Sequence, residues 1–298
     1  MTGLRIPSSG ILRRWLPLVY LLPIAYLLKP VFWNPIDCRF YNFFQSERDI
    51  EPWTEVVVIG IDERTREEVL SEPVYPLSRH LSRHADLTRR LHEAGARAIV
   101  FDLRLSEDVI DSPVANLSEA FRSAGDVYLV MSVTEKAGAI SGTHGAKLQQ
   151  ALVPHPDLLA ASRGAFLAEF WLDADGVVRR FRAGAGLERL HLETLPERLS
   201  GTSVSGSVPI EFPSVDQPMP IVSYRDVLDG DKDAMALVAG RIAFVGSLLS
   251  DSGDIIVAPR PQLLHEGGWK MRNRRLSGLV LFILATRCGG QTGVRGPV

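Results

Sequence analysis

Two aspartates stand at the ends of apolar runs that have the length of a buried strand. Asp62 follows Val56–Ile61, and Asp102 lies near the end of Ala98–Leu103. A continuous apolar run of this kind is typical of a strand buried on both faces in a parallel sheet. Carboxylates at the carboxyl ends of such strands can bind a ligand, a cation or an arginine, or act as general acid and base.

Two further polar residues are expected at the same edge of the sheet. Arg79 stands at the predicted start of a helix, and its planar guanidinium suits a carboxylate. Asp254 follows the last predicted strand. The predicted polar cluster consists of Asp62, Arg79, Asp102 and Asp254. Two interpretations stay open for it: a ligand-binding site, or structural Asp–Arg pairs that hold the loops.

Other patterns that could carry chemistry are incomplete. His80 and His84 are one helical turn apart but lack a third metal ligand, so a solvated helix face is favoured. The acidic residues Glu107, Asp108 and Asp111 do not have the spacing of a calcium-binding loop. The remaining histidines are expected at the surface. The sequence contains no GxxxxGK[ST], HExxH or GxSxG pattern. We therefore predict no catalytic residue, no metal site and no cofactor.

The elements that position the aspartates form a repeating strand–helix pattern. An amphipathic helix over 79–94, ended by Gly95, separates the first two strands, and a helix over 114–124 leads to a third strand at 127–133. Right-handed crossovers then make a parallel sheet, in which the first two strands are expected to be neighbours. The predicted fold class is α/β: a three-layer mixed, mainly parallel sheet with helices on both faces, preceded by one transmembrane helix.

Weaker patterns predict the remaining elements. Asp62 is expected to cap a short helix over 64–70. Helices are also predicted over 154–161, 187–199 and 224–228, and an exposed loop over 134–150. Strands are predicted at 165–172, 177–183, 207–212, 219–222 and 241–246, the first two of them flanking a hairpin turn at 173–176.

The N-terminal segment is predicted to be a membrane anchor. Residues 15–33 are close to the ~20 apolar residues that span a bilayer, with tryptophan at both ends. Arginines lie mainly before this span, which places residues 1–14 in the cytoplasm and the bulk of the chain outside, in a single-pass arrangement at the cell membrane. A cleaved signal peptide is disfavoured because the flanking residues are bulky. A linker is predicted over 34–54, an extracytoplasmic domain over 55–260 and an atypical tail over 261–298.

Composition narrows the classes of protein. The 298 residues are 46% apolar and 23% charged, as in globular proteins, and the net charge of −2 gives no reason to expect a nucleic-acid partner. The two cysteines exclude a disulfide framework and a cysteine-based zinc site.

Eight short motifs follow one another along the chain in a fixed order. They are Val58–Glu63, Tyr75–Arg79, His84–Ala85, Leu91–Ala96, Ile99–Asp102, Asp173–Arg179, Tyr224–Leu228 and Gly240–Ser247 with Asp254 and Pro259. This ordered set resembles a known family, the second class of CHASE domains (cyclase/histidine kinase-associated sensing extracellular domains). The likeness covers about residues 35–260 and departs from the family at Tyr75, where tryptophan is usual, and after Pro259.

The resemblance implies an extracytoplasmic sensor that serves a cyclase, kinase or similar output, and this chain is expected to lack that output. The expected partners are the membrane, an unidentified small-molecule signal, and a second copy or a separate signalling protein. Two alternatives stay open. One is an exported hydrolase in which Asp62 and Asp102 form an acid–base pair. The other is an envelope interaction module.

Overall fold

The computed structural model describes twelve segments, all within one compact unit, Arg48–Val298. They are residues 55–70, 80–106, 113–136, 148–167, 170–172, 177–183, 186–187, 190–191, 206–210, 219–249, 255–266 and 269–277. Among these residues no helix has the length and apolar character needed to cross a bilayer. The predicted anchor lies outside the described residues, and so do the predicted site residues Arg79 and Asp254.

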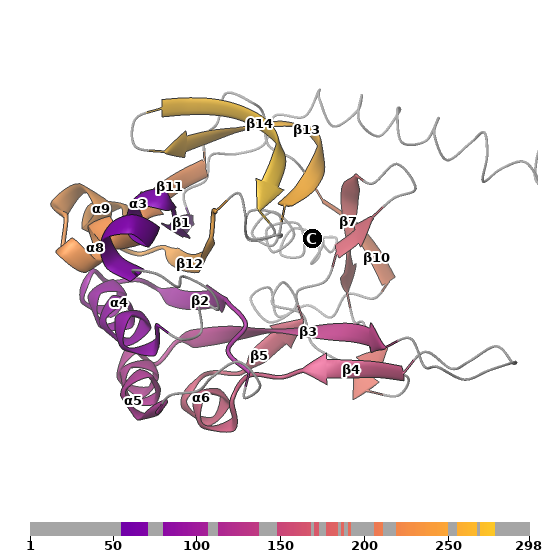
Figure 1. Ribbon diagram of the computed structural model, residues 1–298, viewed down its shortest axis with the longest axis horizontal. Helices are drawn as coiled ribbons and strands as arrows, with labels where there is room; N and C mark the ends of the chain where they lie inside the picture. The colour runs from indigo at the N-terminus through magenta and orange to yellow at the C-terminus, as the bar shows by residue number, and fades with distance from the viewer. Residues whose placement is uncertain are drawn as a thin grey trace, which may run out of the picture. The chain divides into compact units, whose positions relative to one another are not determined.

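A nine-stranded sheet forms the centre of the described residues (Figure 1). Its main path runs β14 (Trp269–Ser277), β13 (Ile255–Glu266), β11 (Met219–Ser223), β1 (Val56–Ile61), β12 (Ile242–Ser247), β2 (Ala98–Asp102), β3 (Val127–Lys136) and β4 (Leu148–Leu152), and β5 (Ala165–Leu167) also pairs with β3. Only β14 and β4 are antiparallel to their neighbours in this sheet. The α/β class and the mainly parallel sheet are therefore confirmed.

The order of the central strands differs from the prediction. The first two predicted strands were expected to be neighbours, but β12 lies between β1 and β2 and is parallel to both. The register places Gly60, Gly246 and Asp102 side by side. All residues of Ile242–Gly246 are buried, which suits a central strand covered on both faces.

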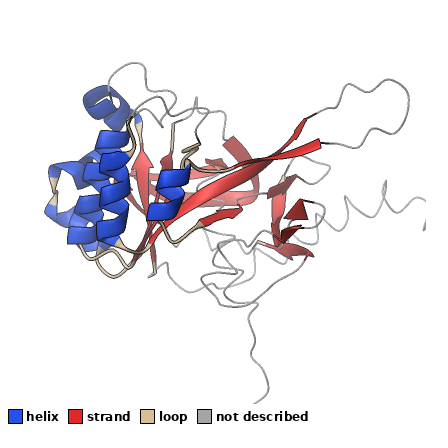
Figure 2. Ribbon diagram, turned by 90° about the horizontal axis from the view of Figure 1, so that it is seen from below, coloured by secondary structure: helices blue, strands red, loops and turns tan. Residues whose placement is uncertain are grey.

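The helices pack on one face of this sheet (Figure 2). All of them except α3 place side chains in a single apolar cluster with Ile59, Phe101 and Val245. The helices of the described residues are α3 (Glu63–Thr65), the π-helix η1 (Arg66–Leu70), α4 (Leu81–Glu93), α5 (Ala115–Ala124), α6 (Pro156–Ala161), α8 (Tyr224–Asp229) and α9 (Lys232–Val238).

The opposite face of the sheet is buried as well, although no helix of the described residues covers it. Val58, Val100 and Phe244 point away from the helix-side cluster and are at most 1% exposed. Strands buried on both faces explain the continuous apolar runs. The expectation of helices on both faces is not met by the described residues, because an apolar run shows that a face is covered but not by which kind of element.

Three local predictions were wrong in part. The predicted loop over 134–150 includes the end of β3 and the start of β4, which pair from Ser132–Leu152 to Lys136–Leu148. The predicted helix over 187–199 begins in the short strands β8 (Gly186–Leu187) and β9 (Leu190–His191). Helix α9 was missed, although Asp231 caps it by accepting hydrogen bonds from two backbone amides.

A small antiparallel sheet and the C-terminal strands complete the description. The small sheet contains β6 (Phe170–Leu172), β7 (Val178–Ala183) and β10 (Gly206–Pro209). Strands β6 and β7 pair in antiparallel fashion, which confirms the strands predicted to flank residues 173–176. Strand β13 runs through residue 260, and β14 ends at Ser277, so strands continue into the segment interpreted as a tail.

Candidate functional site

Asp62 caps helix α3, as the sequence predicted. Its Oδ1 accepts a hydrogen bond from the Thr65 backbone N–H at 2.8 Å and another from the Thr65 hydroxyl at 2.7 Å. The same hydroxyl lies 3.3 Å from the Ser223 hydroxyl and accepts from the Arg225 N–H at 3.4 Å. Asp62 therefore ties the end of β1 to the junction between β11 and α8, which is a structural role.

This network predicts different outcomes for two substitutions at residue 62. Asp62→Ala removes the acceptor of both hydrogen bonds, and we expect a loss of about 1 kcal/mol in the free energy of unfolding. Asp62→Asn keeps an acceptor oxygen and should stay close to the wild type. Urea denaturation of the purified chain measures both. Equal losses for the two variants would contradict capping as the role of Asp62.

The carboxylate that lies near Asp62 is Asp226 of α8. Burial raises the pKa of Asp226, the Arg64 guanidinium at 3.5 Å opposes that shift, and the negative charge of Asp62 adds to it.

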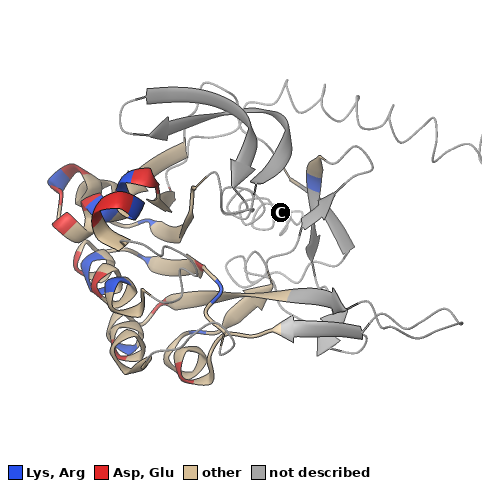
Figure 3. Cartoon of the chain, viewed as in Figure 1, with Lys and Arg blue, Asp and Glu red and all other residues tan. Residues whose placement is uncertain are grey.

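Arg225 forms ion pairs with Glu68 and Asp229 in the same region. Figure 3 shows charged residues gathered on α3, α4 and α8, while β1, β2 and β12 carry few. These pairs are partly exposed, so each contributes little to stability.

Asp102 belongs to a different environment. It is the half-buried last residue of β2 and lines a cavity of about 310 Å³ between the carboxyl end of β2, β3 and the segment that follows β4. The cavity's other polar residues are Arg104, Ser106 and Ser132. Open α/β sheets bind ligands at this edge. Asp102 is thus the predicted site residue that the structure places in a cavity.

The two aspartates do not share one site. Strand β12 separates β1 from β2, so two strand spacings put the two backbones at least about 10 Å apart. The two residues are also offset along the strand direction. Ile61, the residue before Asp62, pairs with Ser247, whereas Asp102 pairs with Gly246. Their surroundings differ as well, because Asp62 is engaged in capping. This geometry favours separate roles over a shared acid–base reaction.

His84 is a core residue and not part of a solvated helix face. It is fully buried, its Nδ1 lies 2.9 Å from the Tyr224 hydroxyl, and its ring packs edge-on against Phe101 and Tyr224. His80 stands at the N-cap of α4. The described residues contain no group of three or more His, Cys, Asp or Glu that could hold a metal ion.

The family assignment rests on the whole domain. A family model described as the CHASE2 domain matches residues 18–277, which is most of the chain. The chain belongs to the CHASE2 domain family. This confirms the resemblance seen in the motifs, and the family is one of extracellular sensory domains. No curated protein and no solved structure matches the chain.

Several residues of this CHASE2 domain were missed by sequence reasoning. Arg104, Ser106 and Ser132 line the Asp102 cavity, and Tyr224 holds His84. The burial of His84 could have been predicted from its position on the helix. It lies at helical spacing on the same face of α4 as the buried residues Leu81, Ala85 and Thr88. Arg104 directly follows the second apolar run, where a ligand-side loop was expected. Ser132 lies inside the continuous strand β3 and gave no signal.

Proposed function

We propose that this chain is a membrane-anchored extracytoplasmic sensory domain that binds a small-molecule signal. The observation that carries the proposal is the CHASE2 match across residues 18–277, since the family consists of extracellular sensory domains. The apolar segment 15–33, preceded by Arg5, Arg13 and Arg14, supports an anchor with the N-terminus in the cytoplasm.

The cavity beside Asp102 supports signal binding at the carboxyl edge of the sheet. Besides β3 and the ends of β2 and β4, its wall includes the residues after β2 and the segment between β4 and α6. These two segments are joined where the His155 N–H donates to the Leu105 carbonyl at 2.7 Å. A ligand that binds this cavity more tightly in one arrangement of the two segments shifts the domain toward that arrangement. The anchor passes that change to a signalling partner.

Topology mapping tests the proposal. Alkaline phosphatase, which is active outside the cytoplasm, or green fluorescent protein is fused after residue 277, where β14 ends. We expect phosphatase activity and no fluorescence. A matched fusion that begins at residue 34 lacks the predicted span and should lose the phosphatase activity. Fluorescence from the fusion that carries residues 1–277, together with an inactive phosphatase, would overturn the proposal.

A further inference from the structure

The cavity beside Asp102 presents both signs of charge to one small volume. Asp102 supplies a carboxylate from the end of β2, and Arg104, two residues later, supplies an exposed guanidinium. The Arg104 Nε donates to the Ser106 hydroxyl at 3.3 Å, and Ser106 is itself buried. This contact holds the base of the guanidinium in the wall. A planar guanidinium suits a ligand carboxylate, while the Asp102 carboxylate suits a ligand ammonium.

The rest of the wall is largely apolar. Leu105 is 1% exposed, and Val130, Met131 and Leu152 are half-buried. The hydroxyl of Ser132 is a further polar group in the wall. A volume of about 310 Å³ is at the small end of the range for small-molecule sites, with the usual combination of apolar walls and a few polar groups. Such a wall suits a short aliphatic chain beside two charged groups.

We infer that the cavity binds a small aliphatic zwitterion, a molecule with one ammonium and one carboxylate, such as a free amino acid. Asp102 binds the ammonium, Arg104 binds the carboxylate, and Leu105 and Met131 contact the aliphatic part. The inference rests on the proposed sensory function and names the chemical class of its signal.

Three probes that differ only in charge test the inference on the purified full chain in detergent. They are L-leucine, 4-methylpentanoate, which lacks the ammonium, and isopentylamine, which lacks the carboxylate. Thermal shift and titration calorimetry measure binding. We expect L-leucine to bind the wild type at least about tenfold more tightly than either singly charged probe, because each charged hydrogen bond that is lost weakens binding by about this factor or more.

Two variants assign the charges. Asp102→Asn should weaken L-leucine at least about tenfold and leave 4-methylpentanoate unchanged, whereas Arg104→Gln should weaken both. Arg122→Gln is the matched control, because Arg122 is exposed on α5 and pairs with Glu119 there. It should change nothing. If a variant fails to fold, the ranking of the three probes on the wild type still tests the inference.

The outcomes separate this inference from the proposed function. Equal binding of all three probes, or none, overturns the zwitterion as ligand. The same holds if L-leucine binding survives both substitutions. If a wider screen finds a stabilising compound of another class while L-leucine does not bind, the inference is overturned and the sensory function still stands. Failure of the topology test overturns the extracytoplasmic function without changing which probe the cavity prefers.

Discussion

Gly60→Ala should destabilise the domain by about 1 kcal/mol, because the added methyl group meets the Leu248 side chain and forces it to move. A Cβ at residue 60 would lie 2.2 Å from Leu248 Cδ1 and 2.9 Å from its Cγ. The Leu248 N–H donates to the Ile61 carbonyl at 3.0 Å, which fixes the Leu248 backbone, so the crowding has to be relieved by a change in the Leu248 side chain. Gly60 lies on β1 between Ser223 and Gly246, so the crowding falls where three strands end. Urea denaturation of the purified chain measures the loss.

A second substitution separates crowding from other causes. Leu248→Ala removes the atoms that the new methyl group meets, so it should restore part of the stability of Gly60→Ala while costing stability in the wild type. Gly95→Ala is the control. Gly95 has φ +78° and no neighbour within 4 Å of a built Cβ, so its cost comes from backbone strain and Leu248→Ala should not relieve it. Additive effects of Gly60→Ala and Leu248→Ala would contradict the crowding argument.

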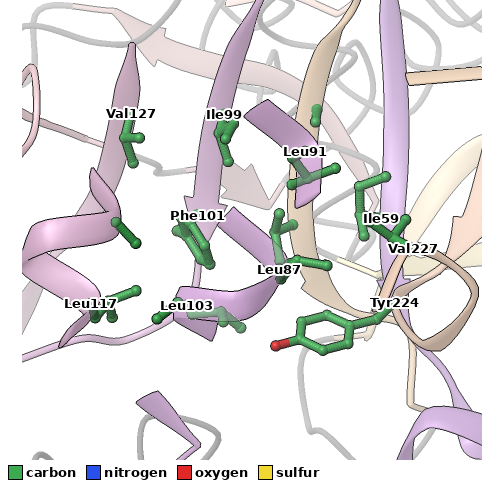
Figure 4. Packing of buried hydrophobic residues seen from close by; sticks show 14 of the residues in the cluster. Ile59, Leu87, Leu91, Ile99, Phe101, Leu103, Leu117, Val127, Tyr224 and Val227 are labelled. Atoms are coloured by element: carbon green, nitrogen blue, oxygen red, sulfur yellow. The ribbon is translucent and has the colours of Figure 1, made fainter. Parts of the chain in front are cut away.

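Tyr224→Phe should cost about 1–3 kcal/mol, because it removes the partner of a buried polar atom. The Tyr224 hydroxyl and His84 Nδ1 are 2.9 Å apart and fully buried, and they join α8 to α4. Figure 4 shows the Tyr224 ring beside the packed side chains of α4, with its oxygen at the edge of the cluster. His84→Leu combined with Tyr224→Phe should cost less than the sum of the single variants, since no unpaired polar atom of this pair remains. A purely additive double variant would contradict this.

The same tyrosine predicts a loss of stability at alkaline pH. Burial raises the pKa of Tyr224 well above its ordinary value of 10.0, and the negative charge of Asp86 adds to the shift. The unfolded chain releases the phenol proton from about pH 10 upward, whereas the folded domain keeps it. The contribution of Tyr224 to stability is therefore full below about pH 10 and decreases above it. Unfolding measured from pH 8 to 11 should show a smaller decrease for Tyr224→Phe than for the wild type.

Local patterns were sufficient for much of the fold. The apolar runs at Val56–Ile61 and Ala98–Asp102 are strands, Asp62 caps α3, and Gly95 follows the end of α4. Each of these depends on neighbours within a few residues: strand burial, a side chain that reaches the next turn, or a glycine that adopts positive φ. The ordered motifs also indicated the CHASE2 family, which the match over residues 18–277 confirms.

Long-range pairing was decided by the tertiary structure alone. Strand β12, far along the chain from β1 and β2, separates them and so separates Asp62 from Asp102. His84 is buried because α8 brings Tyr224 to it, and Asp102 lines a cavity because β3 and the end of β4 complete the wall. The entropy of closing a loop rises only slowly with its length, so distance along the sequence says little about which parallel strands become neighbours. The amino-acid sequence by itself determined the strands, their apolar character, the helix cap and the family. Which polar side chains meet depended on the packing of elements far apart in the chain.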